Sequence, residues 1–516
     1  MLEARFPELA IEVLPMACAE TDSYCMYQAA KAAVALEPDF FVLYMGNNEV
    51  TGQWGVMNFF ARRLRSDVRM VRLWKAFQTL RIVQTIGDMG RRFYLAVTGR
   101  EGPAPEAIFN SLTMYSPQDR VVQDCYKRFG ANVRDICDVG ISCGAQVVIC
   151  TVASNLRDWP PFASRHPGQW GPQEREAWSQ TIERGMSTEK EGHFEKAVQY
   201  YESALTLDSM YAETHYRLGH CYLNIGDTER ARESFVKARD HDRVQVRANT
   251  AINKVLCQTV GEYAGHDVIL VDSASAIAAA SKDGIPGWDV FYDCVHFQFI
   301  GNYLLAKSVY TALCEKISAL NAGIPEACSV MTFEEAEKRL VLTPEILLEH
   351  LKTIEDSILT GINRVFNKEY HVAQVRESRQ FLERRAIELG EDHTRDTYLN
   401  ALTLCPGDNI LRASYVRYLL KKGDAATALT QAQQLCIGKP LLKEALKLLG
   451  MAQYAAHRYA EACETLEQTI SRYPDDWEAW TVIAAAYKAV NDERRAEYAE
   501  KQARRLQQQL TYTSGN

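Results

Sequence analysis

Two kinds of hydrophobic pattern divide the chain. Short apolar runs typical of buried parallel strands occur at 11–17, 39–46, 145–154 and 266–280. Polar and apolar positions with helical spacing lie between these runs, and an amphipathic stretch follows at 301–317. Strands that alternate with helices predict a three-layer α/β domain with a mostly parallel sheet.

Elsewhere the pattern repeats with a fixed period. Small residues that mark close helix contacts recur as Gly185 and Gly219 in mid-chain and as Gly450 later. Further positions in register, 34 residues apart, are Pro406, Pro440 and Pro474, then Ala428, Ala462 and Ala496. The spacing resembles tetratricopeptide (TPR) repeats, which are paired antiparallel helices; an irregular helical bundle is the alternative. The resemblance implies concave surfaces that bind a peptide or protein partner.

These patterns predict a discontinuous chain organisation, because the first repeats interrupt the α/β segments. Such an insertion costs little when it leaves from an exposed loop. The predicted parts are an α/β domain at 1–180 and 243–325, inserted TPR repeats at 181–242, a helical linker at 326–374 and a C-terminal all-α TPR array at 375–516.

Composition narrows the function classes. Among the 516 residues, 47% are hydrophobic and 24% are charged, which is ordinary for globular proteins. The formal net charge of -8 argues against a nucleic-acid partner. The 14 cysteines form no CxxC pair, and no apolar run is long enough for a membrane span. No signal peptide follows Met1, so the expected location is cytoplasmic.

Polar residues with catalytic potential stand at two predicted strand ends. Gly46-Asn47-Asn48-Glu49 ends an apolar run, and Asp293 and His296 precede the last amphipathic helix. In parallel sheets, sites lie beyond the carboxyl ends of the strands. An Asp-x-x-His spacing lets the carboxylate orient the imidazole as a general base. An asparagine amide can stabilise an oxyanion in acyl transfer.

The two blocks, in this order, resemble the SGNH/GDSL hydrolase family, whose motifs include Gly-x-Asn-Asp and Asp-x-x-His. The segment 151–164 is similar to a subgroup that carries TPR repeats. The resemblance implies a flavodoxin-like fold and a serine esterase acting on an acyl ester or a carbohydrate O-acyl group, without a cofactor. It also implies that Asn48 and the backbone N–H of Ala17, or of Met16, form the oxyanion hole. His296 would then be the base, and Asp293 would orient it.

The chain departs from this family at the nucleophile. Its Gly-Asp-Ser block should follow a first strand, and no such block occurs here. Ser23 and Ser273 are the nearest alternatives, and neither has a strand-turn-helix setting. The sequence predicts a truncated start and little esterase activity; a degenerate hydrolase domain that supports a TPR scaffold is the alternative.

Other features have a functional and a structural interpretation. The basic segment 61–84 could contact a membrane or an anionic substrate, although a solvated helical face is expected. Arg157 and Asp158 could reach a substrate or form an ion pair, and Trp54 and Trp288 could line a pocket or fill the core. Histidines without metal-ligand spacing, expected to be structural, are His193, His215, His220 and His241.

Overall fold

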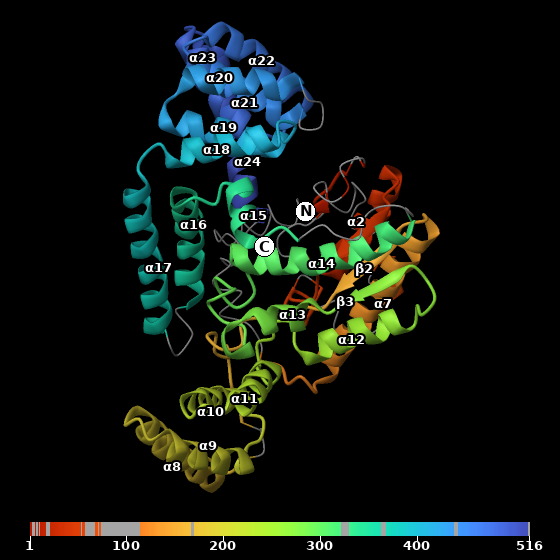
Figure 1. Cartoon of the computed structure of the whole chain (residues 1–516), viewed down its shortest axis with the longest axis vertical. Coiled ribbons are helices and arrows are strands. Elements are labelled where there is room, and N and C mark those ends of the chain that lie inside the picture. Colours follow the sequence, from red (N-terminus) through yellow and green to blue (C-terminus); the bar gives the residue numbers. More distant parts are fainter. Residues whose placement is uncertain are drawn as a thin grey trace, which may run out of the picture. The chain divides into compact units, whose positions relative to one another are not determined.

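A computed structural model shows the arrangement of the chain (Figure 1). The described residues are 1–2, 6, 9, 11–16, 21–52, 54–56, 68–70, 72–73, 114–166, 170–320, 330–362, 368–437 and 442–513. They form parts of two compact units. Unit 1 comprises Met1–Gly102, Asn110–Phe333 and Ile354–Gln374, and unit 2 comprises Pro103–Phe109, Glu334–Thr353 and Val375–Asn516.

Unit 1 contains a parallel sheet of three strands in the order β1-β2-β3. In its register, Val42 lies opposite Val148, and Val148 lies opposite Ile269. The strands are β1 (Phe40–Leu43), β2 (Gln146–Cys150) and β3 (Val268–Val271). The alternation of helices and strands in the sequence therefore gives the predicted parallel pairing.

The sheet is covered on both faces. Val147 and Ile149 pack into one apolar cluster with α2 (Ser23–Ala33), α7 (Arg120–Ser142) and α12 (Thr250–Gly261). Val148 and Cys150 pack into another cluster with α14 (Phe299–Leu320). Side chains alternate along a strand, so the apolar run of β2 serves both layers. The helices of this unit are α2 (Ser23–Ala33), η1 (Val34–Leu36), α7 (Arg120–Ser142), α12 (Thr250–Gly261), α13 (Ser273–Ala280), η2 (Lys282–Gly284) and α14 (Phe299–Leu320).

Two strand predictions are corrected. The prediction of a strand at 11–17 is wrong for residues 11–16, which have no regular structure. Val13 is 76% exposed and Leu14 is 49% exposed. Among the described residues no strand pairs with this segment, and an apolar run becomes a strand only when a neighbour satisfies its backbone groups. The run 266–280 is strand only over β3, because Asp272 caps α13 by accepting from Ser275 N.

The inserted repeats lie between β2 and β3. Added Cβ atoms at Gly185 and Gly219 would come within 3.1 Å of the rings of Tyr201 and Phe235 respectively. Glycine is thus required where the paired helices touch. The two pairs are α8 (Pro172–Lys190) with α9 (Phe194–Leu207), and α10 (Ala212–Asn224) with α11 (Thr228–Asp240).

Unit 2 contains the C-terminal array, in which the same contact recurs. A Cβ atom at Gly450 would lie 2.5 Å from Leu466 Cγ. In the preceding pair the matching positions hold Val416 and Ala432, both buried in one cluster. The helices are α18 (His393–Leu404), α19 (Asn409–Lys422), α20 (Ala425–Ile437), α21 (Leu442–Ala455), α22 (Tyr459–Arg472), α23 (Trp477–Ala489) and α24 (Glu493–Thr513).

Two helices and the start of a third occupy the segment 326–374, which was predicted as a linker. They are α15 (Phe333–Leu340), α16 (Pro344–Ile362) and α17 (Lys368–Leu389).

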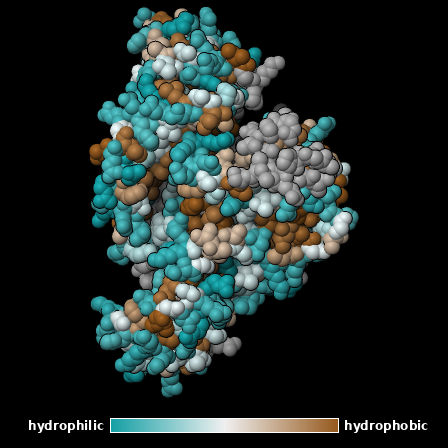
Figure 2. All heavy atoms as spheres, in the orientation of Figure 1, coloured by the Kyte–Doolittle hydropathy of each residue, from teal (hydrophilic) through white to brown (hydrophobic). Residues whose placement is uncertain are grey.

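Hydrophilic side chains cover most of the face seen in Figure 2, with hydrophobic residues in separate patches. No described helix combines the length and hydrophobicity that a membrane span requires.

Candidate functional site

Asp293 and His296 are in direct contact, in the loop that leads to α14. Asp293 Oδ2 lies 2.6 Å from His296 Nδ1, and Asp293 Oδ1 accepts from the backbone N–H of His296 at 2.7 Å. The carboxylate thus holds both the turn and the ring. The side chain of Asp293 is 15% exposed, whereas that of His296 is 74% exposed.

The hydrogen bond with Asp293 raises the pKa of His296 above its ordinary value. In the neutral form, the network assigns the proton to Nδ1, which donates to the carboxylate. Nε2 then carries the free lone pair and is available as a base. The Asp-x-x-His spacing therefore gives the local geometry that a base with an orienting carboxylate requires.

Asn48 lies in the turn after β1 and has a local partner. Its Nδ2 donates to the carbonyl of Thr21 at 3.2 Å. No hydrogen bond joins Asn48 to Asp293 or His296 in the part of the chain that the structure describes. Ala17, the other predicted oxyanion donor, lies outside the described residues.

The segments that carry the two blocks nevertheless meet at the carboxyl ends of the strands. The rings of Tyr44, next to β1, and Phe297, next to His296, have centroids 5.6 Å apart. The Tyr44 hydroxyl also accepts from Ala153 N, beyond the end of β2. These contacts bring the chain after β1, the chain after β2 and the Asp293–His296 loop to one edge of the sheet.

Ser23 is fixed inside the fold. Its Oγ donates to Glu49 Oε2 and accepts from Asn132 Nδ2, both at 2.8 Å, and the residue is fully buried. Burial raises the pKa of Glu49 to about 8. This cluster ties the start of α2 to the turn after β1, a structural role that periodicity does not reveal.

Ser273 is likewise buried, and its Oγ donates to the carbonyl of Thr151 at 2.5 Å. Among the described residues, no serine hydroxyl forms a hydrogen bond with His296. The structure therefore places neither of the two alternative serines against the candidate base.

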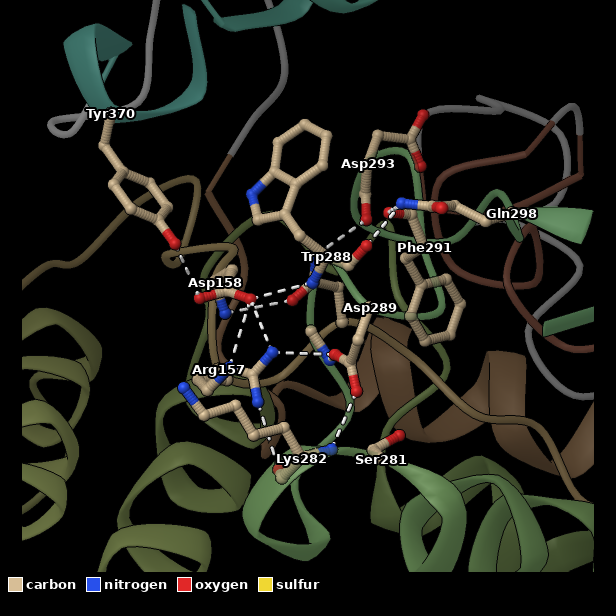
Figure 3. Close-up of polar contacts among 12 residues, drawn as sticks. Arg157, Asp158, Ser281, Lys282, Trp288, Asp289, Phe291, Asp293, Gln298 and Tyr370 are labelled. Carbon is tan, nitrogen blue, oxygen red and sulfur yellow. Dashed lines mark hydrogen bonds and ion pairs between the residues drawn. The ribbon is translucent and has the colours of Figure 1, made fainter. Parts of the chain in front are cut away.

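Arg157 and Asp158 form a buried ion pair (Figure 3). Arg157 Nη2 lies 3.1 Å from Asp158 Oδ2 and 2.7 Å from Asp289 Oδ1. Asp158 also accepts from Trp288 N at 2.8 Å and from the Tyr370 hydroxyl at 3.1 Å. These bonds explain the pair structurally, so the substrate role is not needed to account for it.

The other candidates are mainly structural. Trp54 is buried against Tyr24. The ring centroids of Trp288 and His371 lie 5.4 Å apart. His215 Nε2 lies 2.9 Å from the carbonyl of Ser209. Within the described ranges, no group of three His, Cys, Asp or Glu side chains is placed to hold a metal ion. Of the basic segment 61–84, only residues 68–70 and 72–73 are described.

Charged side chains link the first helices of the three repeats in unit 2. Arg417 on α19 pairs with Glu444 on α21 and lies 3.6 Å from Glu478 on α23. Lys447 on α21 is within 3.4 Å of Glu444, Asp476 and Glu478. We call these five residues the charged face; it spans three successive repeats.

Asn155 and Arg247 are functional candidates that the sequence patterns did not single out. Asn155 Nδ2 donates to the carbonyl of Asp293 at 3.1 Å, and Arg247 Nη1 donates to the carbonyl of Asn155 at 2.9 Å. Arg247 is 4% exposed, and Asn155 is fully buried. A polar residue in an apolar stretch, as in "TVASN", is the only sequence signal for such a role.

Comparisons with known proteins identify the repeats. Residues 190–254 and 444–476 each match a model described as "Tetratricopeptide repeat". The chain therefore contains TPR repeats in both predicted arrays, and no hydrolase family match accompanies them. No curated protein matches the sequence.

Solved structures with some similarity share 15% sequence identity or less with this chain. "MamA MSR-1 C2" shares 15% identity, with 33% of this chain and 98% of that one covered and a TM-score of 0.22. Yeast Tom70 shares 13%, with 65% and 77% covered and a TM-score of 0.21. The P58(IPK) TPR domain shares 12%, with 64% and 99% covered and a TM-score of 0.17.

Proposed function

We propose that this chain is a protein-binding scaffold whose C-terminal TPR array holds a peptide segment of a partner. The observation that carries the proposal is the charged face, which crosses three successive repeats. Stacked helical repeats form extended surfaces because each repeat contacts only its neighbours. The charges on such a surface select partners through complementary charges.

The charged face contains both fixed and adaptable groups. Lys447 is 8% exposed and is held by three carboxylates, while the side chain of Arg417 is 44% exposed. A partner carboxylate can compete for Arg417 without leaving Lys447 unpaired. Leaving a buried charge without its partner costs folding free energy. We therefore expect Lys447 to stay paired and to hold the carboxylates of the charged face in position.

A random peptide library displayed against the full chain tests this proposal. Selected peptides are expected to bind Arg417→Ala about tenfold more weakly, a loss of about 1.4 kcal/mol, as measured by fluorescence anisotropy. The matched control is Arg458→Ala, because the side chain of Arg458 has the same exposed fraction and pairs with Glu461 in the first turn of α22, the second helix of a repeat. Failure to select any peptide, or an equal loss in both variants, would contradict the scaffold proposal.

A second candidate function is ester hydrolysis with His296 as the base. The contact between Asp293 and His296 favours it, and Asn48 and Ala17 remain the proposed oxyanion donors. An ester-bearing substrate would be attacked by a hydroxyl whose proton His296 accepts. Among the described residues no serine forms a hydrogen bond with His296, so the expected turnover is low.

Short-chain nitrophenyl esters test this second function with the full chain. Turnover that disappears in His296→Ala and persists in His457→Ala would support it, because His457 is an exposed histidine of unit 2 that contacts Tyr459. No turnover in the unaltered chain, or equal turnover in both variants, would exclude it.

A further inference from the structure

Asn155 is a junction between the chain after β2 and the Asp293–His296 loop. All four of its polar groups are engaged. Its backbone N–H donates to the carbonyl of Cys294 at 3.0 Å and its Nδ2 to that of Asp293 at 3.1 Å. Its Oδ1 accepts from Asp158 N at 3.0 Å, and its carbonyl accepts from Arg247. Because the residue is fully buried, water cannot replace a lost partner.

The turn that Asn155 begins is held from the side of the inserted repeats. The Tyr216 hydroxyl, on the first helix of the second inserted repeat, donates to the carbonyl of Arg157 at 3.0 Å. Arg247, just after the insert, donates to the carbonyls of Asn155 and Trp159. Arg247 is itself held by the buried Asp242, 3.4 Å away, at the end of the insert.

The same turn is attached to the loop before α14 on its other side. The N–H groups of Leu156 and Arg157 donate to the carbonyl of Pro286 at 2.9 and 3.1 Å. A Cβ atom at Gly287 would lie 2.1 Å from Asp158 Oδ2, so this approach requires glycine. The turn thus lies between the insert and the loop that carries Asp293 and His296, with bonds to both.

We infer that the inserted repeat pair sets the geometry of the Asp293–His296 pair, with Asn155 as the positioning residue. A shift of the Tyr216 helix moves the carbonyl of Arg157, then Asn155, then the Asp293 backbone. We call the inserted repeat pair the clamp, because its contacts with the turn at Asn155 hold the Asp293–His296 loop in position. The inference goes beyond both proposed functions, because it concerns how one part of the chain holds another.

The titration of His296 in the full chain tests this inference. Selective ¹³C labelling of histidines, with His296→Gln to assign the signal, reports the His296 pKa by NMR. The charged group that acts on His296 is Asp293; Tyr292 and Cys294 are titratable neighbours in the loop. In Asn155→Ala the pKa should fall by about half a unit or more, because a loosened Asp293 spends less time on Nδ1.

Asn253→Ala is the matched control for Asn155→Ala. The Asn253 amide also makes two hydrogen bonds to the backbone just after β2, with Val152 N and O. Within the described part of the chain it makes none to the Asp293 loop. Its loss should lower stability and leave the His296 pKa unchanged. An equal shift in both variants, or no shift in Asn155→Ala, would make Asn155 a purely structural residue and overturn its positioning role.

Tyr216→Phe tests the insert itself and does not depend on Asn155→Ala folding. It should lower the His296 pKa in the same direction. Tyr222→Phe, in the same helix, removes a hydroxyl that bonds Glu202 within the repeats and should have no effect. An unchanged His296 pKa in Tyr216→Phe would disprove the clamp. The titration measures neither partner binding nor ester turnover, so its result is independent of both proposed functions.

Discussion

The two TPR arrays share one packing rule and differ in what their first helices face. Gly185, Gly219 and Gly450 each meet the large residue 16 positions later, on the second helix of the pair. In the insert, the first helix of the second pair donates through Tyr216 to the chain after β2. In the C-terminal array, the first helices share the charged face instead.

This difference shows that the outward-facing residues of a TPR repeat, and not its helix packing, determine what the repeat contacts. The ionic contacts at the end of the insert are buried, since Arg247 and Asp242 are 4% and 2% exposed. Arg417 in the C-terminal array remains partly exposed. Buried pairs make strong demands on geometry, whereas exposed pairs exchange readily with solvent or a partner. The first arrangement suits a clamp and the second suits a binding surface.

Arg247→Ala should disrupt the clamp and cause the largest loss of folding stability among these variants. It leaves the buried Asp242 without its cation and removes a donor from two carbonyls, at a cost of about 3–5 kcal/mol. Burial already raises the pKa of Asp242 to about 6. Urea unfolding followed by hydrogen exchange at α10 and α12 measures the loss. Arg243→Ala is the control, because Arg243 is a partly buried arginine whose Nη2 donates to the carbonyl of Arg165. Equal losses in the two variants would contradict the clamp.

Acid should loosen the insert before the C-terminal array. Burial lowers the pKa of His215 to about 4, and it also lowers that of the neighbouring His241; Asp208 and Lys237 act on both. The unfolded chain therefore binds protons first, and stability falls as the pH drops from about 6.5 to 4. The fall of the His215 pKa from 6.5 to about 4 corresponds to roughly 3 kcal/mol.

Hydrogen exchange at two pH values measures this acid effect. Peptides from α10 should lose protection at pH 4.5 relative to pH 7, and His215→Gln should weaken the dependence. Among the described residues of 393–513, the histidines His393 and His457 are not buried, so peptides from α21 provide the internal control. Equal acid sensitivity of α10 and α21 would refute the prediction.

Alanine at the close-contact glycines tests the rule that the arrays share. Gly219→Ala and Gly450→Ala should each cost about 1–3 kcal/mol, because the new methyl group overlaps Phe235 or Leu466. Thermal unfolding with hydrogen exchange at α11 and α22 locates each loss. Gly261→Ala, where no atom lies within 4 Å of the added Cβ, should be neutral. A cost at only one array would show that the packing differs.

Arg417→Ala should have the smallest effect on stability, about 1 kcal/mol or less, because its ion pairs are partly exposed. Thermal unfolding in low and high salt measures this change. A loss as large as that of Arg247→Ala would mean that the charged face is structural, and the contrast between the arrays would disappear.

The sequence predicted the features that depend on spacing. The 34-residue period indicated both arrays, and glycines marked the helix contacts. The apolar runs indicated the three strands that the structure describes. The Asp-x-x-His spacing predicted the contact between Asp293 and His296, because residues three positions apart in a turn have neighbouring side chains. The hydrolase assignment built on that contact stays a proposal, whereas the TPR assignment is confirmed.

The tertiary structure alone decided which distant segments hold these elements. An apolar run at 11–16 carries the strand pattern and forms no strand, because pattern does not supply a hydrogen-bonding neighbour. Asn155 bonds Asp293 across 138 positions and Arg247 across 92. The periodicity of apolar residues indicates which face of a helix or strand is buried, because that face is determined by residues close together in the sequence. The partner of a buried polar group is set by how separate elements pack, and no local pattern encodes it.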